Sequence, residues 1–325
     1  MPVIKIKNFF INHYLANYVD KIEKNISIKS LDKNSKFYII ASKKKRGFFS
    51  ILLFVINHLK FCDENKLIPI IDMKFHKTLY NEKKILFGTY NSWEYFFKKI
   101  NNFKIDKIYN SKKFQICKDT NIYTKNNKFN KNLRNTYKKY IKFNDKILIK
   151  YNFFKKKFFT KNKNILGIHF RGTDMKYTPN HPLPMTRKQV LYHAKNLMKR
   201  YKIKKIFLVT EDIINFRFIM DNFKKENIFH IANFRSSNTK VFDLNMRKSH
   251  KFKLGEEALI NGLCLSNCDF LLSSQTGIAD FAKFINPKIK FFKINNGYNS
   301  KKISFSLIKF TLINFIHIFF NVFKK

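Results

Sequence analysis

In the stretch ILGIHFRGTD, residues 165–174, an apolar run typical of a buried strand is followed directly by a cluster of polar and charged side chains. Its first six residues predict a strand of a parallel sheet, because strands covered on both faces read as continuous apolar runs. Side chains alternate along a strand, so His169 and Arg171 are expected to point one way and Phe170 the other. The sequence therefore places an imidazole and a guanidinium where this strand ends.

Strand-like runs alternate with helical patterns through the rest of the carboxyl half. TRKQVLYHAKNLMKRY (186–201) repeats apolar residues at the spacing of an amphipathic helix. Further strands are predicted at IFLVT (206–210), NIFHI (227–231), DFLLSS (269–274) and IKFFKI (289–294). This alternation predicts a mostly parallel sheet with right-handed crossovers.

A second unit of the same kind is predicted on the amino side. FYIIAS (37–42) and LIPIID (67–72) read as strands, and ILLFVINHLKFC (51–62) between them suits a helix capped near Ser50. Such strand–helix–strand units bind ligands at the carboxyl ends of their strands. Residues 100–163 have weaker periodicity and are expected to form helices and the connection to the next domain.

The 325 residues are enough for two domains, so we expect an α/β protein with two Rossmann-like domains facing a cleft and mostly parallel sheets. The expected boundaries are 1–155 for the first domain, 156–300 for the second and 301–325 for an amphipathic tail. The apolar tail is interrupted by Lys309 and Asn314. An interfacial helix is therefore expected, with core packing and a membrane span as alternatives.

The charge is large, but its residue types do not point to nucleic acid. The formal net charge is +45, from 66 Lys and Arg against 21 Asp and Glu, and only eight of the basic residues are Arg. The abundant Lys, with much Asn, Ile and Phe, is the composition of an AT-rich genome. We expect charge spread over solvated faces, with an anionic membrane or glycolipid and then nucleic acid as the alternatives. Each arginine becomes a stronger candidate for bidentate binding.

The cysteines and the amino terminus suggest a cytoplasmic protein. Cys62, Cys117, Cys264 and Cys268 lack the spacing of a metal site, so we expect reduced thiols and neither a metal nor a cofactor. The first residues, MPVIKIKNFFINHYLANYVD, lack the apolar core and cleavage site of a secretory signal. A peripheral position at the inner face of the cytoplasmic membrane is the alternative location.

Two more polar clusters follow strands of the second predicted sheet. The turn at residues 273–276 joins a strand to a helix, where hydroxyls and free N–H groups suit an anion. Glu211 and Asp212 supply acceptors that would bind ribose hydroxyls or cap the following helix. Arg171 has two interpretations as well, a grip on a pyrophosphate or a structural pair with Asp174. The candidate binding residues are His169, Arg171, Glu211, Asp212, Ser273, Ser274, Gln275 and Thr276.

These motifs resemble those of the GDP-fucose-dependent fucosyltransferases. HFRGTD resembles the HxRxxD motif of the α-1,6 group, which includes the core fucosyltransferase and the bacterial nodulation enzyme, and the turn at 273–275 matches its later SSQ motif. Residues 46–73 and NSWEYFF (91–97) are similar to bacterial members from surface-polysaccharide loci. The resemblance covers roughly residues 36–97 and 164–285, and implies a GT-B-like fold.

The resemblance also implies an activity. The chain would transfer fucose or a related sugar from a GDP-sugar to a glycan or glycolipid acceptor, with inversion and without a metal. Arg171 would hold the β-phosphate beside the SSQ turn, and His169 and Asp212 would line the nucleotide pocket. Asp174 and His181 are the candidate bases.

The chain departs from the family pattern at several positions. Gly172 and Met175 stand where the α-1,6 enzymes have an Arg and a Lys, so Arg235 and Arg247 are candidates for the missing phosphate contact. Asn261 replaces a family Asp. On the acceptor side, the candidates are Arg46, Gly47, Phe48 and Asp72.

Three other functions are alternatives. The first is a glycosyltransferase that uses another nucleotide sugar. The second is a catalytically degenerate sugar-binding homologue, which Met175 and Pro179 suggest. A basic nucleic-acid-binding protein would need clustered Arg with interleaved aromatic residues, whereas the Lys here are diffuse.

Overall fold

The computed structural model describes residues 36–111, 113–124, 128–172, 175, 178–237, 241–244 and 246–322. The chain divides into two compact units, Met1–Asn144 and Asp145–Lys325. The predicted boundary at residue 155 falls inside helix α5 (Asp145–Phe159), with which the second unit begins.

The first unit holds a three-stranded parallel sheet with the strand order β2-β1-β3. Its elements are β1 (Phe37–Ile40), α2 (Phe48–Glu64), β2 (Ile68–Ile71), α3 (Ile105–Ser111), β3 (Phe114–Ile116) and α4 (Arg134–Tyr140), with short 3-10 helices at Ser92–Tyr95 and Lys131–Leu133. The predicted strand–helix–strand unit is present. The third strand was not predicted because only three residues of a Lys- and Asn-rich stretch form it.

Helix α2 fills the core of the first unit. Leu52, Val55, Ile56 and Leu59 are all buried almost completely. The helix begins at Phe48, and Gly47 occupies the N-cap position in an extended conformation with no side-chain cap bond. The predicted cap near Ser50 was therefore wrong, since the apolar pattern already starts at Phe48 and Phe49.

The second unit holds a five-stranded sheet, all parallel, with the order β6-β5-β4-β7-β8. Its elements after α5 are β4 (Ile165–His169), α6 (Arg187–Arg200), β5 (Lys205–Val209), α7 (Ile213–Asn222), a 3-10 helix (Lys225–Asn227), β6 (Ile228–Phe229), α8 (His250–Leu265), β7 (Phe270–Ser273), α9 (Gly277–Ile285), β8 (Lys290–Lys293) and α10 (Ile303–Val322). The predicted α/β class with parallel sheets is thus confirmed.

The strand order places a topological switch between β4 and β7. The chain moves from β4 through β5 to β6 on one side, then returns to β7 and β8 on the other. Loops at the carboxyl ends of two strands diverge at such a point, and open α/β sheets bind their ligands there.

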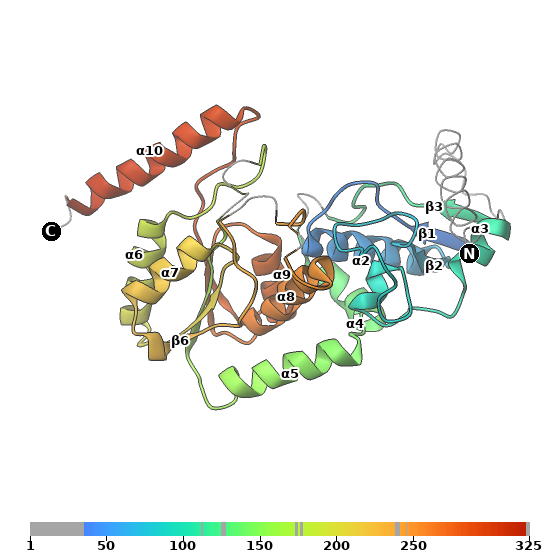
Figure 1. The fold of residues 1–325 in the computed structure, drawn as a ribbon, viewed down its shortest axis with the longest axis horizontal. Helices are drawn as coiled ribbons and strands as arrows, with labels where there is room; N and C mark the ends of the chain where they lie inside the picture. The colour runs from blue at the N-terminus through green and yellow to red at the C-terminus, as the bar shows by residue number, and fades with distance from the viewer. Residues whose placement is uncertain are drawn as a thin grey trace. The chain divides into compact units, whose positions relative to one another are not determined.

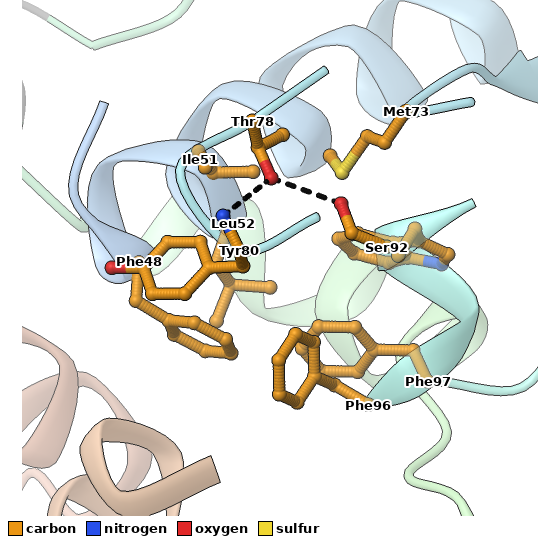
Figure 2. A pocket seen from close by; sticks show the side chains of 10 residues that line it. Phe48, Ile51, Leu52, Met73, Thr78, Tyr80, Ser92, Phe96 and Phe97 are labelled. Carbon is orange, nitrogen blue, oxygen red and sulfur yellow. Dashed lines mark hydrogen bonds between the residues drawn. The ribbon is translucent and has the colours of Figure 1, made fainter. Parts of the chain in front are cut away.

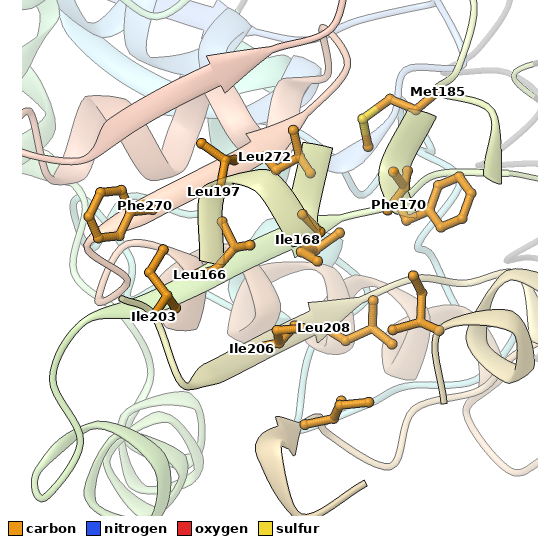
Figure 3. Packing of buried hydrophobic residues seen from close by; sticks show 14 residues of the cluster. Leu166, Ile168, Phe170, Met185, Leu197, Ile203, Ile206, Leu208, Phe270 and Leu272 are labelled. Atoms are coloured by element: carbon orange, nitrogen blue, oxygen red, sulfur yellow. The ribbon is translucent and has the colours of Figure 1, made fainter. Parts of the chain in front are cut away.

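The residues of β4 alternate between the two faces of this sheet. Leu166 and Ile168 face the apolar cluster shown in Figure 3, which residues of β5, β7 and α6 complete. On the other face, a Cβ at Gly167 would lie 3.0 Å from both Cys268 Sγ and Leu265 Cδ2. Glycine there allows the end of α8 to approach the strand closely. All four cysteines are buried, and none of them forms a disulfide.

The tail forms the helix α10 at the periphery of the second unit, on the side of α6 (Figure 1). Among the described residues, no helix combines the length and the apolar character needed to cross a bilayer.

Candidate functional site

The three predicted clusters follow neighbouring strands. In the order β5-β4-β7, Asp212 follows β5, Arg171 follows β4 and Ser274 follows β7. The register pairs His169 with Val209 on one side and with Ser273 on the other. The three polar segments therefore leave one edge of the sheet next to one another.

His169 connects the tip of β4 to the turn after β7. Its Nδ1 lies 3.0 Å from Thr276 Oγ1 and 3.3 Å from Ser273 Oγ. Burial, together with the nearby charge of Arg171, lowers the pKa of His169 to about 3. The imidazole is therefore neutral near pH 7 and orders these hydroxyls rather than supplying a charge. It was expected at the rim of the sheet, but only 4% of the residue is exposed.

The turn at 273–276 opens helix α9. Ser273, Ser274 and Thr276 are buried, and Thr276 Oγ1 accepts a bond of 3.4 Å from the Ala279 N–H as the helix N-cap. The first N–H groups of a helix have no partner within it, and the helix dipole favours an anion there. The structure thus gives the turn the geometry of an anion-binding helix start.

Lys293 is a residue at this edge that the sequence analysis missed. It ends β8, pairs in register with Ser273, and donates from Nζ to Gln275 Oε1 at 2.5 Å. The available signal was its position at the end of the predicted strand IKFFKI, where Lys is hard to distinguish from the many others in this chain.

Arg171 lies close to a carboxylate from the neighbouring strand tip. Its Nε is 3.7 Å from Glu211 Oε1, and the two side chains are 37% and 34% exposed. The same Oε1 accepts a bond of 3.1 Å from the N–H of Gly172. Ion pairs as exposed as this one contribute little to stability. Asp174 lies outside the described residues.

Asp212 has a structural role in the described chain. It is buried, and its Oδ1 accepts bonds from the N–H groups of Ile214 at 2.8 Å and Asn215 at 3.1 Å, which caps α7. Of the two expected roles, capping is the one present here. Gly172 packs directly on this cap, because a Cβ there would lie 2.2 Å from Asp212 Oδ2. This contact leaves no room for a side chain at position 172.

The two arginines predicted as secondary phosphate contacts are held by local interactions. Arg235 lies over the ring of Phe216, 4.0 Å from its centroid, and donates to the Ile231 carbonyl at 2.9 Å. Arg247 forms a bidentate pair with Glu257, at 2.5 and 2.9 Å. That pair neutralises the charge of Arg247.

His181, the second candidate base, is exposed. Its carbonyl accepts a bond of 2.8 Å from the Asn299 N–H. The Nδ2 of Asn299 also donates to the carbonyls of Met175 at 2.6 Å and Thr178 at 2.8 Å. The segment that follows Arg171 is thus fastened to the segment that precedes α10.

A cavity of about 380 Å³ lies at the end of β6. Aromatic residues of α5 and β6 line it, including Phe154, Phe158 and Phe229, together with Lys157 and His230. This cavity was not predicted from the sequence, because the segment that forms α5 shows little periodicity. Among the described residues, no group of three or more His, Cys, Asp or Glu could hold a metal ion.

Arg46 is engaged within the first unit. Its Nη2 lies 2.8 Å from Asp119 Oδ1, and its Nε donates to Ser42 Oγ at 3.1 Å. Burial raises the pKa of Asp119, but the bonds from Arg46 and Ser42 outweigh it and keep the pKa below its usual value. Gly47, the next residue, is exposed at the start of α2.

The other two acceptor-side candidates are buried. The Oδ1 of Asp72 accepts from the N–H groups of Lys74 and Phe75, and its Oδ2 from the Tyr109 hydroxyl at 2.7 Å. Phe48 lines a cavity of only about 10 Å³ (Figure 2), which is room for a single water molecule and not for a sugar. Both residues stabilise the fold of the first unit.

The neutral His169 predicts a stability that falls with acidity. Its folded pKa of about 3 lies below the ordinary 6.5, so below pH 6.5 the unfolded chain binds a proton that the folded chain does not. The associated stability is complete above pH 6.5 and is lost as the pH falls toward 3. Relative to His169→Gln, the wild type should lose on the order of 2 kcal/mol more between pH 7 and pH 5. Chemical denaturation at the two pH values measures this, and parallel losses would contradict it.

The close approach of Gly172 to Asp212 predicts a steric cost for any side chain. Gly172→Ala should lower the free energy of unfolding by about 1–3 kcal/mol, because Asp212 must move and release the α7 cap. Thermal unfolding tests this, with Gly47→Ala as the control because a Cβ there meets nothing within 4 Å. Equal melting temperatures for the two variants would show that the contact is not tight.

Among the comparisons with known proteins, only solved structures match this chain. No family model and no curated protein matches it. Among solved structures, NodZ α-1,6-fucosyltransferase co-crystallised with GDP matches with a TM-score of 0.55 and 13% identity, over 81% of this chain and 96% of that one. A crystal of the same enzyme soaked with GDP-fucose gives 0.54 and 13%, over 78% and 93%. NodZ from Bradyrhizobium gives 0.52 and 13%, over 78% and 94%. This chain therefore has the Rossmann-like, GT-B type of fold found in the NodZ fucosyltransferase.

Proposed function

We propose that this chain is a glycosyltransferase that transfers fucose, or a related sugar, from a GDP-sugar to a glycan or glycolipid acceptor. The proposed reaction inverts the anomeric carbon and uses no metal. One observation carries the proposal. On a fold shared with NodZ, a partly exposed arginine and a hydroxyl-rich helix start follow neighbouring strands at a topological switch point.

The proposed donor site uses both sides of that switch. Arg171 would leave its weak pair with Glu211 and bind the β-phosphate with its planar fork. The first amides of α9 and the hydroxyls at 273–276 would bind the same diphosphate from the β7 side. Lys293 would add a second positive charge, which makes it the proposed replacement for the family's missing basic residues.

The proposed reaction is a single displacement. The acceptor hydroxyl oxygen forms a bond to the anomeric carbon while the bond from that carbon to the β-phosphate oxygen breaks. GDP leaves with the electron pair, and Arg171 and the α9 start stabilise the charge that develops on it. The acceptor proton passes to a base, for which Asp174 and His181 remain the proposed candidates.

The acceptor and its location are also proposals. A glycan or lipid-linked acceptor at the inner face of the cytoplasmic membrane would suit a chain in which basic residues far outnumber acidic ones. Arg46 and Gly47 are the acceptor-side candidates that are not fully buried.

Ligand-induced stabilisation is the test of the donor. In a thermal-shift screen against GDP-, UDP-, ADP- and CMP-sugars, GDP-fucose should raise the melting temperature most, because a ligand at 100 times its Kd stabilises the native state by about 2.7 kcal/mol. A larger shift with another nucleotide sugar would identify that sugar nucleotide as the donor in place of GDP-fucose. Binding without hydrolysis or transfer would identify a degenerate homologue, and no shift with any nucleotide sugar would contradict the proposal.

The role of Arg171 is tested by a substitution that keeps its charge. Arg171→Lys should lower kcat by at least ~10²-fold with GDP-fucose and an acceptor, which is the scale of losing one transition-state donor. Arg217→Lys, on the exposed side of α7, is the matched control and should retain its activity. Turnover of the Arg171 variant close to that of the control would exclude the phosphate clamp.

A further inference from the structure

Helix α10 presents an apolar face to solvent. Five large side chains spaced three or four residues apart lie on one side of it and are 49–56% exposed: Phe305, Ile308, Leu312, Phe315 and Ile316. Ser306 is buried, and Phe310 and Ile313 are partly buried, on the other side of the helix. A surface helix normally turns its apolar residues inward, so an exposed apolar face of this extent indicates an interaction surface.

The charges around this face are all of one sign. From Phe281 to the end of the chain there are nine Lys and no Asp or Glu. Lys301 and Lys302 are exposed immediately before the helix, and Lys309 lies on it. Helices with an apolar face flanked by lysines are typical of proteins that bind anionic lipid surfaces. A second copy of the chain would instead bring these lysines toward one another, which costs energy.

The start of α10 is fastened to the segment that follows Arg171. Leu183 N–H donates to the Gly297 carbonyl at 2.8 Å, and Asn299 bonds the backbone of Met175, Thr178 and His181. Ser306 Oγ, in the first turn of the helix, accepts a bond of 2.8 Å from the Ser300 N–H.

The helix also starts from the edge of the sheet that carries the site. Strand β8 runs parallel to β7, and β7 runs parallel to β4, so the carboxyl end of β8 lies at the same edge as Arg171. The chain leaves β8 at that end and reaches α10 within ten residues. Whatever α10 binds is thereby held near the strand tips of the second unit.

We propose that α10 docks on an anionic membrane surface. Its outer face enters the headgroup region, Lys301 and Lys302 contact lipid phosphates, and the site-bearing edge of the second unit is held at the bilayer. The helix lies along the interface and does not span it. This docking goes beyond the proposed transfer reaction and does not require that GDP-fucose be the donor.

Vesicle co-sedimentation of the full chain tests the docking. The protein should sediment with phosphatidylcholine vesicles that contain phosphatidylglycerol, less at high salt, and much less with phosphatidylcholine alone. The combined variant Ile308→Gln, Leu312→Gln, Phe315→Gln should partition at least ~10-fold more weakly, because three apolar side chains no longer enter the interface. A matched control, Ile149→Gln with Phe153→Gln on α5, removes exposed apolar side chains elsewhere and should bind like the wild type.

Three results would overturn the proposal: no sedimentation of the wild type, equal sedimentation with both vesicle types, or unchanged binding of the α10 variant. A dimer in buffer that the α10 variant converts to a monomer would assign the face to a second copy. The melting temperature and the GDP-induced shift, measured on the same samples, separate this docking from folding and from donor binding, since both should be unchanged by the α10 substitutions.

Discussion

The register of β4 between β5 and β7 is the constraint on which the candidate site depends. It places His169 opposite Ser273, so that a neutral imidazole joins the tip of β4 to the turn that opens α9. The burial that keeps this imidazole uncharged also leaves the positive charge of the edge to Arg171 and Lys293, which are closer to solvent. One buried contact thus orders the turn at residues 273–276, while Arg171 and Lys293 carry positive charge at the same edge of the sheet.

Glu211 and Gly172 fix the position of the backbone that follows β4. The carboxylate holds the backbone after β4 through the Gly172 N–H and lies near the Arg171 guanidinium at the same time. The absence of a side chain at Gly172 lets this backbone rest on the Asp212 cap. The packing at this point leaves no room for a side chain at position 172.

Periodicity predicted most of the architecture, because buried parallel strands and amphipathic helices have patterns that survive a skewed composition. The strands at 165–170, 206–210 and 269–274 appear within a residue of those bounds. Side-chain partners were harder to predict. The charge of Arg247 is neutralised by Glu257, which lies ten residues later in α8. Lys293 reaches Gln275 because β8 pairs with β7. Such partners depend on tertiary packing, and in a chain with abundant Lys the sequence does not single out Lys293.

Hydrogen–deuterium exchange with and without GDP tests most directly whether the neighbouring strand tips bind one diphosphate. The account predicts that GDP slows exchange in two separate segments at once, around residues 170–172 after β4 and around residues 274–279 at the start of α9. Arg171→Ala should abolish the protection in both. Protection confined to one of these segments, or found only at the cavity beside β6, would contradict a shared diphosphate site.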